Sequence, residues 1–238
     1  MNVFILAAGF GKRMRDLTAS VPKPMLAING IRLIDYSLYL CHLWGVDKIW
    51  VNTFYLSEII RDHLKNFKGK AIFVSEEKDK ILGTAGGIRT AYPMDSESEN
   101  LILINPDTII LPNKNFKIKN KLPANSKIHL YLKPIPANQS YTKISLSSSG
   151  KVSFGSGDLY YIGLAIIDVR CLKKIPQNEY ADLSDTFKEL EISGKITGEV
   201  FLGEVLDLGT KELWESYSTK DIFGAEKTKI QNFIHSNF

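Results

Sequence analysis

The stretch ILAAGFGKRMRDLTASVPKPML, residues 5–26, begins as a short apolar run and continues into glycines and cations. Gly9 and Gly11 let the backbone turn tightly and present its N–H groups, which suits the oxygen atoms of a phosphate. Three cations follow in the same loop: Lys12, Arg13 and Arg15. We therefore expect a phosphate-like anion in front of this loop.

Two commoner phosphate-binding motifs do not match the loop. A dinucleotide fingerprint needs a third glycine where Met14 stands, and a Walker A loop needs a glycine where Leu6 stands. Farther along, Pro22 and Pro24 flank Lys23, and we expect an extended segment there that aims the lysine ammonium. A proline-flanked lysine alone is more often a surface turn, but shortly after a basic glycine loop it indicates a phosphate contact.

Short apolar runs alternate with helical patterns along much of the chain. Strands are expected over 3–7, 48–54, 71–74, 101–105, 127–132, 160–168 and 199–209. Helices are expected over 32–45, 56–67, 85–92, 183–194 and 213–218. The lysine-rich stretch 112–127 is interpreted as a solvated loop. The alternation predicts an α/β protein with a mostly parallel sheet covered on both faces, and with its ligand beyond the carboxyl ends of the strands.

Length, composition and charge narrow the class of protein. The 238 residues, 44% of them hydrophobic, suit a single domain over 1–238. A net charge of +4 is too small for a nucleic-acid-binding surface, so we expect a small anionic ligand. Cys41 and Cys171 lie far apart and are expected to be reduced and buried. The apolar start is too short to span a membrane, so we expect a cytoplasmic protein without membrane contact.

The opening stretch resembles the signature of the sugar-1-phosphate nucleotidylyltransferases, LAAGxGxR followed by PKP. The matching residues are Leu6, Ala7, Ala8, Gly9, Gly11 and Arg13, then Pro22, Lys23 and Pro24. The segments LGTAGGI (82–88), LILINPD (101–107) and LDLGT (206–210) fit the same family. The resemblance implies a Rossmann-like nucleotidyltransferase fold, a three-layer α/β/α sandwich around a mostly parallel mixed sheet.

The resemblance also implies a reaction. A sugar 1-phosphate would attack the α-phosphorus of a nucleoside triphosphate, giving a nucleotide-sugar and pyrophosphate. Because a phosphate monoester is largely dianionic near neutral pH, with a second pKa of about 6, the nucleophile needs no general base. In the family pattern Gly11 and Arg13 would hold the triphosphate and Lys23 the α-phosphate. Lys12 is expected to face solvent.

Two carboxylates are expected to hold Mg²⁺ as the cofactor. Asp107 follows the run LILIN, and Asp207 lies between two leucines on an expected strand, where an unpaired acid is costly. Magnesium prefers one or two carboxylates together with substrate phosphates. A lone aspartate at a strand end is ordinarily a turn cap, but two of them beside the loop motifs indicate metal ligands. Pro106 departs from the family, which usually has a small residue before the first aspartate.

The family places the segment 82–88 beside the base and the sugar. Gly83 and Thr84 are expected to contact the nucleotide, with Thr84 capping the helix that follows, and Glu76 or Glu77 to contact the base. The expected sugar contacts are Gly87, Asn105 and Gly163. A lysine that the family often carries before the last of these is absent, which leaves open what supplies that charge.

The acceptor-side pattern and the short C-terminal part resemble the compact N-acetylmuramate, mannose and heptose 1-phosphate enzymes. We expect UTP as donor ahead of GTP, and a monomer or homodimer without nucleic-acid partners. One alternative is a phosphocholine-type cytidylyltransferase, which the glycines after Thr84 disfavour. Another is a non-catalytic nucleotide-binding regulatory module, which is disfavoured because Arg13, Lys23, Asp107 and Asp207 are all present.

Overall fold

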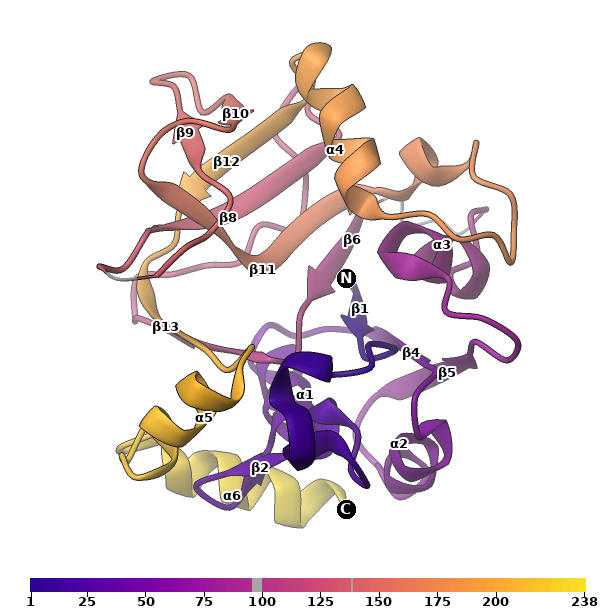
Figure 1. Cartoon of the computed structure of the whole chain (residues 1–238), viewed down its shortest axis with the longest axis vertical. Coiled ribbons are helices and arrows are strands. Elements are labelled where there is room, and N and C mark those ends of the chain that lie inside the picture. The colour runs from indigo at the N-terminus through magenta and orange to yellow at the C-terminus, as the bar shows by residue number, and fades with distance from the viewer. Residues whose placement is uncertain (96–99, 138) are drawn as a thin grey trace. The chain divides into compact units, whose positions relative to one another are not determined.

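A computed structural model describes residues 1–95, 100–137 and 139–238, and the chain divides into two compact units. The N-terminal unit comprises Asn2–Ile81, Asn105–Ile109 and Leu206–Phe238. The central unit comprises Met1, Leu82–Ile104 and Ile110–Val205. The single domain expected over residues 1–238 stays a prediction. Figure 1 shows the chain, with helices and strands of both units labelled where the view leaves room.

The N-terminal unit is built on three parallel strands, β1 (Asn2–Leu6), β4 (Lys48–Thr53) and β5 (Ala71–Glu76). In this register Ile5 lies beside Val51, which in turn lies beside Val74. Helix α1 (Leu33–Leu43) is buried along most of its length, and α2 (Ser57–Leu64) packs on β4 and β5. The remaining elements are η1 (Lys12–Thr18), η2 (Lys23–Met25), β2 (Ala27–Ile28), β3 (Ile31–Arg32), α5 (Lys211–Ser218) and α6 (Glu226–Asn237).

The central unit is mainly antiparallel. Its long strand β11 (Leu159–Asp168) pairs with β6 (Asn100–Ile104), β8 (Ile128–Pro134) and β9 (Ile144–Leu146). Strand β10 (Val152–Phe154) extends β9 antiparallel, and β12 (Ile196–Val200) runs parallel to β8. Its helices are α3 (Gly83–Ala91), η3 (Val169–Leu172) and α4 (Leu183–Ile192). Strands β7 (Thr108–Pro112) and β13 (Gly203–Asp207) form a separate pair, and the boundary between the two units falls within each of them.

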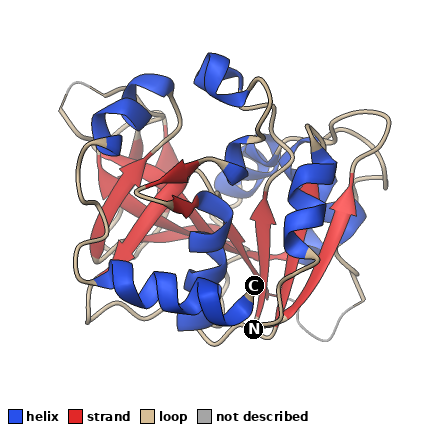
Figure 2. Cartoon of the chain, turned by 90° about the horizontal axis from the view of Figure 1, so that it is seen from below, coloured by secondary structure: helices blue, strands red, loops and turns tan. Residues whose placement is uncertain are grey.

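Most of the expected elements are confirmed within a few residues, and the α/β class with a mixed sheet is confirmed as well (Figure 2). The strand expected over 199–209 is wrong, because the chain forms β12 and β13 there, with a break between them. Strand β12 pairs with β8, whereas β13 pairs with β7. An added Cβ at Gly203, the first residue of β13, would lie 2.2 Å from the carbonyl oxygen of Leu111, so only glycine fits where the chain approaches β7.

The elements that were not expected include β7, β9, β10 and α6. Strands β9 and β10 have three residues each, too few for an alternating pattern to be visible. Helix α6 is mostly polar and buries only Ile230 and Phe233.

The cysteines are free, with Cys41 buried and Cys171 half-buried, and burial raises the pKa of the Cys171 thiol to about 12. Within the ranges that the structure describes, no helix is long and apolar enough to cross a membrane.

Candidate active site

The glycine loop after β1 is shaped around Gly11. Its φ of +65° lies in the left-handed region, and its carbonyl oxygen accepts hydrogen bonds from Met14 N at 2.8 Å and Thr18 Oγ1 at 3.1 Å. An added Cβ would lie 3.0 Å from Thr18 Cγ2 and 3.2 Å from Lys23 Cβ, whereas at Gly9 it would meet nothing within 4 Å. Gly11 is therefore the position that requires glycine.

A buried asparagine fixes the start of the loop. Ala7 N donates to Asn52 Oδ1 at 3.0 Å, and Asn52 Nδ2 donates to Glu77 Oε1 at 2.8 Å. All three residues are buried. Asn52 was not among the predicted site residues, although a polar residue inside the apolar run 48–54 was a visible signal.

Glu76 is bound to the helix that follows β4. Its Oε1 accepts from Ser57 Oγ at 2.7 Å and its Oε2 from Arg61 Nη1 at 3.0 Å. Both carboxylate oxygens thus have partners on α2, while Glu77 supports Asn52. A contact between Glu76 and the base stays a prediction.

The structure pairs Lys23 with Asp107. Lys23 Nζ lies 2.6 Å from Asp107 Oδ2, and the lysine side chain is only 11% exposed. The expected extended segment is wrong, because Lys23–Met25 forms one 3-10 turn in which Leu26 N donates to Lys23 O. The fixed φ of Pro24 suits the first turn of a helix, so it favours this turn while Pro22 stays extended.

The second aspartate lies beside the first along the backbone. Leu208 N donates to the carbonyl oxygen of Asp107 at 2.9 Å, and Asp207 ends β13 with its Oδ1 accepting from Gly209 N at 2.6 Å. A Cβ at Gly209 would lie 2.6 Å from Asp207 Oδ1 and 3.3 Å from Arg13 Nη2. Gly209 therefore admits both side chains. Gly209 was not among the predicted site residues, although it belongs to the motif LDLGT.

The donor set fits magnesium. Across 1–95, 100–137 and 139–238, no group of three or more His, Cys, Asp or Glu residues forms a complete metal site. Asp107 and Asp207 offer two carboxylates from adjoining segments, which leaves coordination positions for phosphate oxygens and water, as Mg²⁺ prefers.

The other two cations of the loop have different surroundings. Arg15 Nη2 lies 3.0 Å from Glu212 Oε1 at the start of α5. Lys12 is exposed, as expected, and its Nζ lies 5.0 Å from the centre of the Phe10 ring. Of the three cations, Arg13 lies beside Gly209 and Asp207.

The glycines of LGTAGGI admit a segment of the chain itself. Ala85 N and Gly86 N both donate to Ala181 O, at 3.0 and 3.1 Å. An added Cβ at Gly83 would lie 2.6 Å from that same oxygen. The expected cap by Thr84 is wrong, because α3 already begins at Gly83 and no side chain caps it.

The predicted site residues divide between the two units. Those of the N-terminal unit are Leu6, Ala7, Ala8, Gly9, Gly11, Arg13, Lys23, Glu76, Asn105, Asp107 and Asp207. Those of the central unit are Gly83, Thr84, Gly87 and Gly163. Gly163 has a φ of +79° and lies where the pairing of β11 with β8 shifts register, between Tyr161 and Ala165.

The glycine loop and the nearby lysine–aspartate pair lie in an α/β protein of the kind expected to bind a phosphate, and comparison with known sequences gives the family. The pattern described as nucleotidyl transferase matches residues 2–153, and the chain belongs to this family.

Three relatives show how far the similarity extends. The chain is 27% identical over 213 residues to D-glycero-α-D-manno-heptose 1-phosphate guanylyltransferase of Aneurinibacillus thermoaerophilus, covering 85% of this chain and 92% of that protein. It is 31% identical over 218 residues to N-acetylmuramate α-1-phosphate uridylyltransferase of Neisseria meningitidis, covering 88% and 94%. CTP:phosphoglutamine cytidylyltransferase of Campylobacter jejuni is 34% identical over 80 residues, covering 34% of this chain and 32% of that protein.

Solved structures agree with the fold. HddC from Yersinia pseudotuberculosis matches with a TM-score of 0.70 and 19% identity over 91% of this chain and 97% of that one. UDP-glucose pyrophosphorylase complexed with UDP-glucose matches with a TM-score of 0.72 and 16% identity over 91% and 96%. The predicted nucleotidyltransferase fold is therefore confirmed.

Proposed function

We propose that the protein transfers a nucleotidyl group from a nucleoside triphosphate to a sugar 1-phosphate, with release of pyrophosphate. The observation that carries the proposal is the 2.6 Å pair of Lys23 and Asp107 beside the Gly11 loop. Two relatives matched over 85% and 88% of the chain are named for nucleotidyl transfer to sugar 1-phosphates, which supports the same chemistry here.

The residues of the N-terminal unit account for the reaction through binding and charge. An oxygen of the sugar phosphate attacks the α-phosphorus, and the bond from that phosphorus to the β-bridging oxygen breaks, so pyrophosphate leaves. The N–H groups of the loop would bind triphosphate oxygens. Arg13 and Lys23 would stabilise negative charge as it moves from nucleophile to leaving group. The ion pair with Asp107 holds the lysine ammonium in place for this role.

We propose Asp107 and Asp207 as the residues that hold Mg²⁺. When bound, the ion would neutralise phosphate charge and orient the triphosphate. Each carboxylate also contacts the protein itself. Asp107 pairs with Lys23 and positions its ammonium, and Asp207 accepts a hydrogen bond from Gly209 N, next to Arg13.

The donor and the setting of the reaction complete the proposal. We favour UTP, with GTP next, because the relatives include a uridylyltransferase and a guanylyltransferase. The same proposal places the protein in the cytoplasm as a monomer or homodimer, and light scattering after size-exclusion chromatography tests the oligomeric state.

A pyrophosphate-release screen tests the proposed function directly. It combines the four common ribonucleoside triphosphates with a panel of sugar 1-phosphates and with phosphocholine. We expect release only with a sugar 1-phosphate present. Release with CTP and phosphocholine instead would favour the phosphocholine-type cytidylyltransferase alternative. The cytidylyltransferase among the relatives is named for phosphoglutamine and matches only 34% of this chain. Binding of triphosphate without any release would favour a regulatory module.

A further inference from the structure

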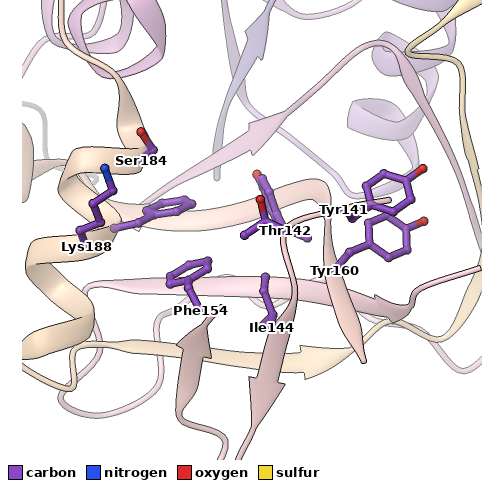
Figure 3. Close-up of a pocket in the computed structure, with 9 residues that line it drawn as sticks. Tyr141, Thr142, Ile144, Phe154, Tyr160, Ser184 and Lys188 are labelled. Carbon is purple, nitrogen blue, oxygen red and sulfur yellow. The ribbon is translucent and has the colours of Figure 1, made fainter. Parts of the chain in front are cut away.

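The central unit has hollows of opposite chemistry. One is an aromatic cavity of about 400 Å³, formed by the segment before β9, by β10 and β11, and by α4 (Figure 3). The rings of Tyr141 and Tyr160 stack at one end, with centroids 4.1 Å apart and planes at 21°, and Phe154 and Phe187 line the same cavity. Because β11 carries both Tyr160 and the predicted sugar contact Gly163, this cavity shares a strand with the predicted substrate contacts.

The other is a basic pocket of about 520 Å³, where the segments that precede β8 and β12 meet the end of β11. Backbone hydrogen bonds fix this junction, since Lys127 N donates to Lys195 O at 2.8 Å and Asp168 N donates to Lys127 O at 2.8 Å. Of the described residues that line the pocket, none is aromatic, and the charged ones are Lys121, Lys127, Arg170, Lys195 and the single acid Asp168. The pocket therefore carries a surplus of positive charge.

The acid holds two of these cations in place. Asp168 Oδ1 accepts from Arg170 Nε at 2.8 Å, and Asp168 Oδ2 accepts from Arg170 Nη2 at 2.7 Å and from Lys127 Nζ at 2.6 Å. The Asp168 side chain is only 3% exposed, whereas those of Lys127 and Arg170 are 38% and 46% exposed. Because a lysine ammonium has three donors, Lys127 keeps donors for a second anion.

The other two cations lack a counter-charge. Among the described residues, neither Lys121 Nζ nor Lys195 Nζ takes part in an ion pair. By contrast, Lys119 of the same lysine-rich stretch lies 2.6 Å from Glu199. Like charges around one pocket repel each other, and an anion with several charges relieves that repulsion. The arrangement therefore favours a multiply charged anion over a single carboxylate.

The basic pocket lies at the opposite end of β11 from the predicted sugar contact. Gly163 precedes Asp168 on this strand by about 16 Å of extended chain. The pairing of β11 with β6 shows the same separation, because Asp168 lies beside Asn100 at the start of β6 and Leu164 lies beside Ile104 at its end. A ligand in the basic pocket would therefore leave the predicted sugar contacts accessible.

We infer that the basic pocket binds a compact phosphate compound with two or more phosphate groups close together, separately from the predicted substrate contacts. The inference does not depend on the proposed function. The lining offers no aromatic ring on which a nucleobase could stack, so the phosphate groups supply the affinity. Lys121, Lys127 and Lys195 bind the phosphate oxygens, and the amide of Asn125 offers a further donor.

Backbone-amide NMR of the whole chain tests the inference, with pyrophosphate as the first probe. We expect a saturable shift of the Lys127 and Lys195 signals. In the double variant Lys121→Gln/Lys195→Gln, the Kd measured at Lys127 should rise about tenfold or more, because two charged contacts are lost. The matched control is Lys114→Gln/Lys117→Gln, which removes two exposed lysines of the same stretch that do not line the pocket. It should leave this Kd nearly unchanged.

Two variants and further probes complete the test. Lys121→Gln alone, at an exposed side chain, should weaken binding by a smaller factor and covers a folding defect in the double variant. Tighter binding of a hexose bisphosphate than of pyrophosphate would support the inference and assign a phosphorylated sugar as the source, and the reverse order would support it with an inorganic phosphate.

Three outcomes would overturn the inference. Sodium chloride at equal ionic strength would produce the same shifts if the response were only charge screening. ATP would bind at the Lys127 signal more tightly than tripolyphosphate if the pocket recognised a base. Pyrophosphate would shift signals of the Gly11 loop and none at the basic pocket if the N-terminal unit alone bound it, a result that would agree with the proposed function.

Discussion

The Gly11 loop of the N-terminal unit and the aromatic cavity of the central unit are built in opposite ways. The loop lies within one short stretch, and its predicted contacts are backbone N–H groups, Arg13 and Lys23. The cavity takes its walls from segments more than forty residues apart, from Tyr141 to Lys188, and its surface consists of side chains. The loop therefore suits a phosphate, which every donor and acceptor carries, whereas the cavity suits a group with apolar faces.

This difference separates chemistry from selectivity. A phosphate is recognised by charge and N–H groups, which tolerate few changes. A ring-lined cavity discriminates by shape and by one or two hydrogen bonds, so each wall residue has a smaller effect. We therefore expect substitutions in the loop region to change turnover most, and those in the central unit to change selectivity or stability.

The largest effect is expected at the two carboxylates. Asp107→Asn and Asp207→Asn should each lower kcat by ~10³-fold, because each removes charge from the proposed metal site. The double variant should be little worse than either single one if they act as a unit. Steady-state pyrophosphate release over a magnesium titration measures this. Asp62→Asn, an exposed carboxylate of α2 paired with Lys65, is the control. Additive losses would contradict a shared site.

Lys23→Ala should lower kcat by ~10²-fold or more, since it removes a cation proposed to act at the α-phosphate. The fold should persist, because Asp107 is 24% exposed and water can replace its lost partner. Turnover and thermal unfolding are measured together. Lys12→Ala, which removes an exposed cation of the same loop, should have little effect. Near wild-type turnover in Lys23→Ala would exclude the proposed role.

Gly11→Val should weaken triphosphate binding about tenfold or more and sugar-phosphate binding far less. Valine resists a φ of +65°, and its Cβ would crowd Thr18 and Lys23. Calorimetric titration with each ligand measures this. Gly30→Val is a matched control, because Gly30 also has a positive φ but an added Cβ would meet nothing within 4 Å. Equal losses for both ligands would contradict a triphosphate role for the loop.

The smallest effect on turnover is expected at Asp168 in the central unit. Burial raises the pKa of this carboxyl, but hydrogen bonds from Arg170 and Lys127 outweigh burial and bring the pKa to about 2. Because the folded pKa lies below the unfolded value, this group contributes ~2 kcal/mol above about pH 4, and the contribution is lost as the pH falls toward 2.

Thermal unfolding between pH 5 and pH 2 tests this contribution. Asp168→Asn should unfold at a lower temperature at pH 5 and show a smaller drop on acidification, with turnover at neutral pH nearly unchanged. A drop as large as that of wild type would mean that other groups cause the acid sensitivity. A large loss of turnover would contradict the expectation that substitutions in the central unit change selectivity or stability and leave turnover nearly unchanged.

The sequence-based predictions were accurate for contiguous motifs and buried strands, and they failed for very short strands and for contacts between distant segments. The buried runs of β1 and β4 and the glycine at position 11 were predictable, because a fully buried parallel strand and a left-handed turn each require particular residue types. Strands β9 and β10 were not, since three residues carry no usable period. Asn52 was missed because its role depends on Ala7 and Glu77, which reach it only through strand pairing.

The sequence alone determined the alternation of strands and helices with a mostly parallel sheet, the tight turn at the Gly11 loop and the family, because these depend on local patterns and on contiguous motifs. Only the tertiary structure decided that Lys23 pairs with Asp107, 84 positions away, and that the tyrosines, Phe154 and Phe187 enclose one cavity. Side chains from distant segments meet only after the strands have paired and the helices have packed. Their distances and partners follow from that packing and from no pattern along the chain.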